Sequence, residues 1–159
     1  MLLRDLLREY IYECEIKKYS PRTIKEYRNN IKLFFNYLSV YEQPFMKKKI
    51  ENYSIQELEL VDSLLIDRFL SYLTFYDNES GKSYNNSEVG KSRKLSTLRT
   101  FFAFFFNKGH ISSNVAAIVK IPKIRSKDII RLENDEVQEM LQTTETLSGF
   151  SVHQQKYNE

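Results

Sequence analysis

The stretch KSRKLSTLRTFFAFFF, residues 91–106, decides the fold class. Its apolar side chains recur at intervals of three and four residues, the period of one face of a helix. The members of this face are Leu95, Leu98, Phe101, Phe102, Phe105 and Phe106. A helix end follows at Lys108-Gly109, because glycine tolerates the left-handed backbone there. We therefore expect a long helix over 87–107 with a buried aromatic face, and we expect Phe104, which falls off that face, to contact another helix or a second subunit.

Helical periodicity continues on both sides of this stretch. Ser20-Pro21 predicts a helix start, because the serine side chain accepts a hydrogen bond from a free backbone N–H and proline has no N–H to leave unpaired. Asp62 is a similar cap, and Ser54-x-x-Glu57 is a capping box that predicts a short turn. The expected helices are 3–15, 21–40, 62–76, 87–107 and a short one over 115–119, with a loop at 77–84. The predicted fold class is all-α, a bundle of four to five helices.

The composition is that of a soluble globular protein. Of the 159 residues, 42% are hydrophobic and 28% are charged, and 11 Phe and 11 Tyr can fill a core. No apolar run reaches the roughly 18 residues that span a bilayer, and charged residues interrupt the N-terminus where a leader peptide is apolar. We expect a cytoplasmic protein without membrane contact. Cys14 lies in a helical pattern and is expected to be a small buried residue.

Charge is distributed unevenly along the chain. The formal net charge is +3, yet residues 82–127 carry ten Lys and Arg against one Glu, a net +9. Residues 128–159 carry a net −5, and residues 17–32 hold a second basic stretch of net +5. Such basic segments repel themselves unless a polyanion or solvent screens them. They therefore indicate either nucleic-acid binding or a solvated surface.

The two basic stretches coincide with the expected helices 21–40 and 87–107. Their polar faces lie beside the apolar ones and carry Arg22, Lys25, Arg28, Asn29 and Lys32 on the first helix, and Ser92, Arg93, Ser96 and Arg99 on the second. Lys and Arg neutralise phosphates, Ser, Thr and Asn bond to phosphates or base edges, and a helix fits the major groove. The two faces together, followed by the basic stretch 120–127 around Pro122, favour DNA binding over an ordinary solvated surface.

The sequence contains no recognisable constellation for catalysis or metal binding. His110 and His153 are 43 residues apart and have no Cys nearby, which is not the spacing of a metal site. Gly-rich phosphate loops, nucleophile elbows and zinc-protease motifs are missing as well. The Phe run at 101–106 is expected to be core and not a base-stacking platform. We expect no cofactor, no metal and no self-contained active site.

Several motifs, in their order along the chain, resemble the phage integrase or tyrosine site-specific recombinase family, including its Xer-type members. One group resembles the beginning of the family's N-terminal domain: Ser20, Thr23, Tyr27, Phe34, Phe35 and the apolar stripe at 65–73. A second group resembles its fourth helix, the turn after it and the interdomain linker: residues 91–99, Phe101, Phe102, residues 108–111, Asn114 and residues 121–123. Residues 132–137, LENDEV, resemble the first helix of the catalytic domain, so the resemblance covers nearly the whole chain.

The resemblance implies a SAM-like core-binding domain at 1–118, a basic linker at 119–131 and the start of a catalytic domain at 132–159. In the family, the core-binding and catalytic domains form a C-shaped clamp around double-stranded DNA, and the second and fourth helices of the core-binding domain meet the major groove. The residues then expected to face a recombination half-site are Thr23, Lys25, Asn29, Lys32, Lys91, Ser92, Arg93, Ser96 and Arg99. Lys120, Lys123 and Arg125 would follow the DNA backbone where the linker crosses it.

The chain departs from the family pattern at two points. Val115 stands where the family usually has Pro after the asparagine. The family's catalytic Arg, Lys, His-x-x-Arg, His or Trp, and nucleophilic Tyr have no counterpart before Glu159, since Tyr157 comes too early. The resemblance therefore implies an N-terminal fragment or truncated product from a bacterium, phage or mobile element, which binds DNA without cutting it. A full-length parent would be a tetramer on synapsed DNA, and this chain a monomer.

Other functions stay open from the sequence. The chain could be a stand-alone helical regulator, or a truncated recombinase that occupies sites without reacting. It could instead be a helical protein-interaction module whose acidic segment 128–159 docks on a partner or on its own basic faces. The absence of a catalytic constellation argues against an enzyme.

Overall fold

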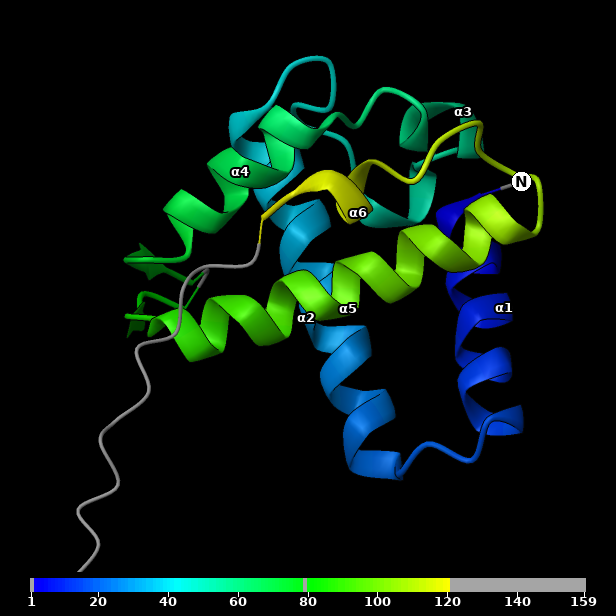
Figure 1. Cartoon of the computed structure of the whole chain (residues 1–159). Helices are drawn as coiled ribbons and strands as arrows, with labels where there is room; N and C mark the ends of the chain where they lie inside the picture. Colours follow the sequence, from blue (N-terminus) through cyan, green and yellow to red (C-terminus); the bar gives the residue numbers. More distant parts are fainter. Residues whose placement is uncertain (1, 79, 121–159) are drawn as a thin grey trace, which may run out of the picture. The chain divides into compact units, whose positions relative to one another are not determined.

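The computed structural model describes residues 2–78 and 80–120 (Figure 1). The α-helices are α1 (Leu3–Ile16), α2 (Pro21–Tyr41), α3 (Ile55–Leu58), α4 (Ser63–Tyr72), α5 (Glu88–Asn107) and α6 (Val115–Ile118). A 3-10 turn, η1 (Ile50–Asn52), precedes α3, and two short strands, β1 (Tyr76–Asp77) and β2 (Ser83–Tyr84), form an antiparallel hairpin between α4 and α5. The predicted all-α class is confirmed.

Short-range hydrogen bonds determine where the helices begin. The Ser20 hydroxyl accepts from the Thr23 backbone nitrogen at 3.1 Å and Pro21 occupies the first position of α2, as the sequence predicts. Asp62 caps α4 through the Leu65 nitrogen at 2.7 Å. In the predicted capping box, the Ser54 backbone nitrogen donates to Glu57 Oε2 at 2.7 Å. These starts were predictable because each bond lies within three residues.

The predicted helix to about Tyr76 and the predicted loop at 77–84 are wrong in part. Helix α4 ends at Tyr72, and Tyr76 pairs with Tyr84 across the hairpin, where their rings stack at 5.2 Å. Asn78 Oδ1 accepts from the backbone nitrogens of Ser80 and Lys82 at 3.1 and 2.8 Å and so closes the turn. Strands of two residues are too short for alternation to show in a sequence.

The aromatic stripe of α5 also differs from the prediction at its C-terminal end. Phe104 is 9% exposed and packs its ring on Tyr10 of α1, with centroids 5.6 Å apart, which confirms the expected contact with another helix. Phe106, predicted to point inward, is 45% exposed. The buried stripe is wider than the predicted one, because α5 packs against α1 as well as α2. Phe104 lies one helical turn after Phe101 and joins that stripe, whereas Phe106 lies beyond its edge.

The core forms where α5 crosses α2, with α1 packed against both (Figure 1). Phe35 lies edge-on to Phe101 at 6.2 Å, and Phe34 to Phe102 at 6.4 Å. Phe101, Phe102 and Phe105 are fully buried, so the Phe run is core apart from Phe106. Helix α6 packs against α5 and α4. Cys14 is buried, as expected.

Candidate nucleic-acid interface

One face of α2 is exposed and basic. Lys25, Asn29 and Lys32 are exposed and lie at spacings of four and three residues, so they share one side of the helix. Arg22 and Arg28 flank them and are also exposed. The opposite side of α2 is buried in the core. Within the described residues, none of the four cations on this face has an ion-pair partner, so their charge is directed to solvent.

Thr23 lies at the start of the same helix. Its hydroxyl bonds to the Ser20 hydroxyl at 2.8 Å, and its backbone nitrogen donates to the same oxygen. The side chain is half-buried. Thr23 therefore takes part in the cap that begins α2. It lies near the exposed basic face but is less exposed than Lys25, Asn29 and Lys32.

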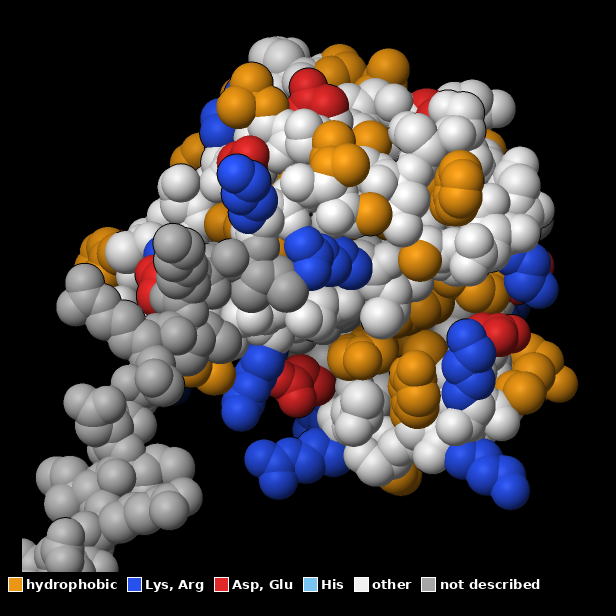
Figure 2. All heavy atoms as spheres, in the orientation of Figure 1, with side chains coloured by type: hydrophobic (Ala, Val, Ile, Leu, Met, Phe, Trp, Pro, Cys, Tyr) orange, Lys and Arg blue, Asp and Glu red, His pale blue; other side chains and the backbone are white. Residues whose placement is uncertain are grey.

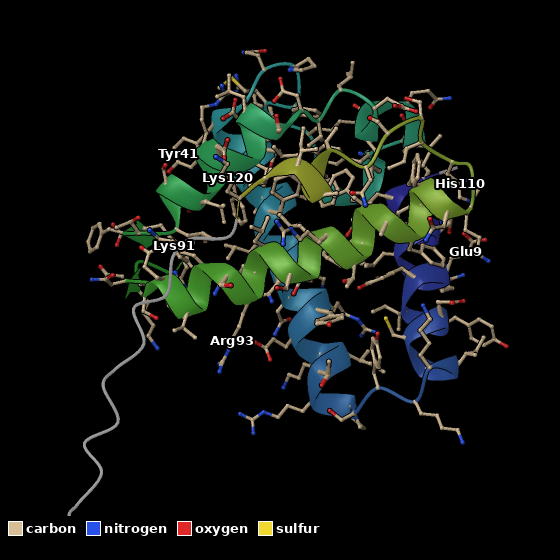
Figure 3. The ribbon with its side chains drawn as sticks, viewed as in Figure 1. Glu9, Tyr41, Lys91, Arg93, His110 and Lys120 are labelled. Carbon is tan, nitrogen blue, oxygen red and sulfur yellow. The ribbon has the colours of Figure 1, made fainter. Side chains whose placement is uncertain are left out.

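The exposed polar strip of α5 is narrower than the number of Lys and Arg residues in 82–127 suggests. Arg93 and Ser96 are exposed, three residues apart on one side of the helix. Figure 3 shows Arg93 pointing away from α5 into solvent, on the side toward the beginning of α2. Figure 2 shows Lys and Arg side chains on this part of the surface, below α5 and around the beginning of α2. The strip of α5 thus adds one free arginine and a hydroxyl to the charges of α2.

Lys91 and Ser92 are less available than the sequence suggests. The Lys91 ammonium bonds to Glu88 Oε1 at 3.0 Å, and the Lys91 side chain is only 12% exposed. Ser92 is half-buried. Glu88 is the single acidic residue in the basic segment, and it lies one turn before Lys91.

Arg99 already has partners inside the protein. Its Nε donates to the Ala116 carbonyl oxygen at 3.2 Å, and its Nη2 donates to the Val119 carbonyl oxygen. These acceptors belong to α6 and its C-terminal end, where helix carbonyls lack partners within the helix. The guanidinium therefore attaches α6 to α5. Sequence spacing gave no sign of this contact, because the acceptors are backbone atoms 17 and 20 residues away.

The predicted linker residues are described only at their beginning. Lys120 is exposed and follows α6 directly. Lys123 and Arg125 lie outside the described residues, as does His153.

Lys94 does not belong to the exposed strip. Its ammonium donates to Asn86 Oδ1 at 2.8 Å, and Asn86 Nδ2 donates to the Leu73 carbonyl oxygen at 2.9 Å. Burial lowers the pKa of Lys94 below its ordinary value. This relay attaches the beginning of α5 to the end of α4, so Lys94 positions the helix.

A buried hydrogen bond joins the two helices where they cross. Asn30 Nδ2 donates to Thr97 Oγ1 at 3.0 Å, and both side chains are buried. Each is preceded in sequence by an exposed candidate contact, Asn29 on α2 and Ser96 on α5. Sequence reasoning missed this pair, since a lone Asn or Thr on an amphipathic helix looks like a surface residue and the two are 67 positions apart.

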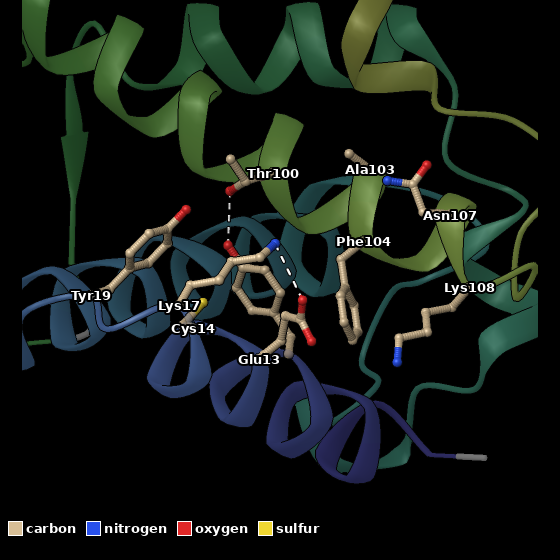
Figure 4. Close-up of a pocket in the computed structure, with 10 residues that line it drawn as sticks. Glu13, Cys14, Lys17, Tyr19, Thr100, Ala103, Phe104, Asn107 and Lys108 are labelled. Carbon is tan, nitrogen blue, oxygen red and sulfur yellow. Dashed lines mark hydrogen bonds and ion pairs between the residues drawn. The ribbon is translucent and has the colours of Figure 1, made fainter.

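The cavities offer no catalytic constellation within the described residues. A cavity of about 260 Å³ lies between α1 and α5 and is lined by Glu13, Cys14, Lys17 and Lys108 among others (Figure 4). Lys17 there is paired with Glu13 at 3.3 Å, and burial raises the pKa of the Cys14 thiol.

In residues 2–78 and 80–120, no group of three or more His, Cys, Asp or Glu side chains could hold a metal ion. Among the residues that the structure describes, every helix is too short or too polar to span a bilayer.

The fold and this surface define a small all-α domain in which two crossing helices present a polar, basic face. Residues 2–121 match the family model of the phage integrase SAM-like domain, and the chain belongs to this family. The resemblance found in the sequence is confirmed.

Curated relatives agree with that assignment. The chain is 29% identical over 144 residues to tyrosine recombinase XerC of Caldanaerobacter subterraneus subsp. tengcongensis, a match that covers 86% of this chain and 39% of that protein. It is 31% identical over 106 residues to XerC of Thermodesulfovibrio yellowstonii, covering 67% of this chain and 27% of the relative. Tyrosine recombinase XerD of Staphylococcus epidermidis is 26% identical over 142 residues, or 89% of this chain and 41% of the relative. The chain thus spans well under half the length of these relatives. No solved structure matches it.

Proposed function

We propose that the chain binds double-stranded DNA through the exposed faces of α2 and α5, as the core-binding part of a tyrosine recombinase that acts in DNA recombination or integration. One observation carries the proposal. Four cations without ion-pair partners among the described residues lie on one face of α2, and the exposed strip of α5 that crosses this helix adds Arg93. The family assignment supports the same function.

The proposed contacts divide by chemistry. Lys25, Lys32 and Arg93 neutralise phosphates, and each releases counterions when it does so. Asn29 and Ser96 carry hydrogen-bonding groups without charge and are placed to reach phosphates or base edges. Thr23, Lys91 and Ser92 lie at the margin of this surface, and Arg99 contributes by holding α6. Lys120 begins a basic linker in which Lys123 and Arg125 follow the DNA backbone.

The proposed division of the chain follows the same reasoning. Residues 1–118 form the core-binding domain, 119–131 the linker and 132–159 the beginning of a catalytic domain. We assign no catalytic role to any residue of this chain and no cofactor. The half-site is bound by one chain, and assembly into a tetramer on synapsed DNA belongs to a full-length recombinase.

A gel-shift titration with duplex DNA tests the proposal. The chain should bind at low salt, and log K should fall linearly with log salt, because phosphate contacts release counterions. Lys25→Ala and Arg93→Ala should each weaken binding and reduce the salt slope by about one, with the thermal midpoint unchanged. Lys49→Ala is the matched control, since Lys49 is exposed but lies beyond the opposite end of α2. Absence of any shift at low salt would contradict the function, and unfolding of either variant would contradict the assignment of the faces.

A further inference from the structure

We propose that the Asn30–Thr97 pair sets the register with which α5 crosses α2, and thereby determines which DNA sequence the chain prefers. The inference rests on the proposed function and adds positioning residues to it. Neither side chain touches the surface that would meet DNA, because both are buried: Thr97 is 1% exposed and Asn30 8%.

The pair stands out against its surroundings. Among the described residues, the buried polar or charged side chains other than tyrosines are Asn30, Glu42 and Thr97. Glu42 is satisfied by Arg68 and Tyr37, away from the crossing. Asn30 Nδ2 donates to Thr97 Oγ1 at 3.0 Å. A buried amide without its partner is costly, so the core favours the one register in which the two meet.

The hydrogen bond continues into the backbone of α5 and into α1. Thr97 Oγ1 donates to the Arg93 carbonyl oxygen at 3.2 Å, and Thr100 Oγ1 donates to the Thr97 carbonyl oxygen at 2.9 Å. Thr100 also bonds to the Tyr10 hydroxyl at 2.8 Å. The pair is therefore part of a polar network that reaches from α1 through α5 to α2, and Arg93 lies at one of its ends.

The aromatic contacts around the pair specify the register of the two helices less well than the Asn30–Thr97 hydrogen bond does. Burial of apolar area is non-directional, so rings such as Phe34 and Phe102 tolerate small displacements more readily than a side-chain hydrogen bond does. A hydrogen bond between side chains depends steeply on distance and angle. A shift of α5 by one turn, about 5.4 Å, would break the bond and change the positions of Ser96 and Arg93 relative to α2. The spacing of the candidate contacts on the two helices consequently depends on Asn30 and Thr97.

A double substitution separates positioning from stability. Asn30→Leu with Thr97→Val replaces both polar groups by apolar groups of similar shape, which leaves no unpaired donor or acceptor in the core. Thr97→Val by itself strands the Asn30 amide and should lower the thermal midpoint, whereas the double variant should recover most of that loss. Tyr37→Phe is the matched control, because it removes a hydrogen bond of the same helix that belongs to its contact with α4 and not with α5, the 2.5 Å bond to Glu42.

The readout is sequence discrimination. Duplexes enriched from a random pool by the wild-type chain serve as the specific probe, and the unselected pool as the non-specific one. The double variant should keep the affinity for the unselected pool and its salt slope, but lose about tenfold in the ratio of the two affinities, the amount that one base pair contributes. Tyr37→Phe should keep the full ratio. A double variant that retains the wild-type ratio overturns the proposal.

A second measurement needs no DNA and distinguishes the register role of the pair from the proposed DNA-binding function. Spin labels at Arg28→Cys and Asn107→Cys, in a Cys14→Ala background, report the distance from α2 to the end of α5. The double variant should shift or broaden this distance distribution, and an unchanged distribution overturns the positioning role. If the wild type binds no DNA while the distribution still shifts, the proposed function has failed and the register role has not. If the wild type binds DNA but enriches no sequence, the specificity inference is overturned and the proposed function stands.

Discussion

Glu42 shows how one side chain holds two helices together. Its carboxylate accepts from Arg68 Nε and Nη2 at 2.9 and 2.7 Å and from the Tyr37 hydroxyl at 2.5 Å. Tyr37 belongs to α2 and Arg68 to α4, so the carboxylate joins these helices. The hydrogen bonds from Arg68 are the main cause of a pKa of Glu42 below its ordinary value, and they outweigh the opposing effect of burial.

The lowered pKa predicts a loss of stability in acid. Because the folded-state pKa of Glu42 lies below the unfolded value of about 4.3, its contribution is complete above that value and is lost as the pH falls through the folded-state pKa. Glu42→Gln should therefore lower the thermal midpoint near neutral pH and flatten its decline in acid. Circular dichroism melts between about pH 3 and 7 measure this. Glu15→Gln, at an exposed position on α1, should keep the wild-type profile; an equally steep decline in Glu42→Gln would refute the assignment.

Truncation of two phenylalanines of α5 should lower stability by different amounts. Phe104→Ala removes a ring that packs on Tyr10 and Phe105, and should lower the free energy of unfolding by about 3 kcal/mol. Phe106→Ala should cost less than about 1 kcal/mol, because the Phe106 ring is 45% exposed. Urea denaturation of the two variants distinguishes the structure, in which Phe104 is buried, from the stripe predicted from the sequence, in which Phe106 points inward. Equal losses, or a larger loss for Phe106, would contradict the structure.

Helix α5 performs different tasks on different faces. Its aromatic face fills the core, the strip of Arg93 and Ser96 is exposed, and Arg99 holds α6. Periodicity predicted the first two faces, because they follow from the 3.6-residue turn. The third could not be predicted, since it depends on where another helix ends in space. The same limit applies to the hairpin, whose pairing joins residues on either side of a turn.

Arg99→Ala should release α6 from α5. Loss of both donors leaves the carbonyl oxygens of Ala116 and Val119 without their partner, so the backbone amides around α6 should exchange hydrogen faster. Arg99→Lys should restore little, because an ammonium cannot supply two donors in a fixed fork. Hydrogen exchange followed by mass spectrometry measures the effect. If Arg99→Ala reduced the salt slope of DNA binding and left exchange at α6 unchanged, Arg99 would be a phosphate contact.

The described residues have a core of their own. The buried apolar side chains run from Leu3 in α1 to Val119 at the end of α6, and α6 packs against both α5 and α4. Charge is unevenly distributed along the chain. The formal net charge is +3 in total but +9 within residues 82–127. Three of the ten Lys and Arg in that segment are committed to the fold, because Lys91, Lys94 and Arg99 have partners within the protein. Of the two helices α2 and α5, α2 therefore carries most of the free positive charge.

A chain that ends at Lys120 should fold by itself. Since the core of the described part closes at Val119, residues 1–120 should keep the thermal midpoint of the 159-residue chain and most of its affinity for DNA. A chain that ends at Asn107 is the control, because it lacks the buried Ile111, Ala116 and Val119 and the acceptors of Arg99. It should melt at a lower temperature. Calorimetry and gel shifts on the two chains measure this, and a strong loss of stability in the 1–120 chain would contradict the proposed domain boundary.

The sequence by itself determined the all-α class, the helix caps, most of the aromatic stripe of α5 and the basic face of α2, because each of these depends on residues within one or two turns of one another. It also carried enough ordered motifs to indicate the family. The tertiary structure decided which polar residues remain free. Lys91 is paired within its own helix, Arg99 is occupied by α6, and Asn30 is buried against Thr97. These outcomes depend on how the helices cross. The crossing is set by packing and hydrogen bonds between residues far apart in the chain, which no local pattern records.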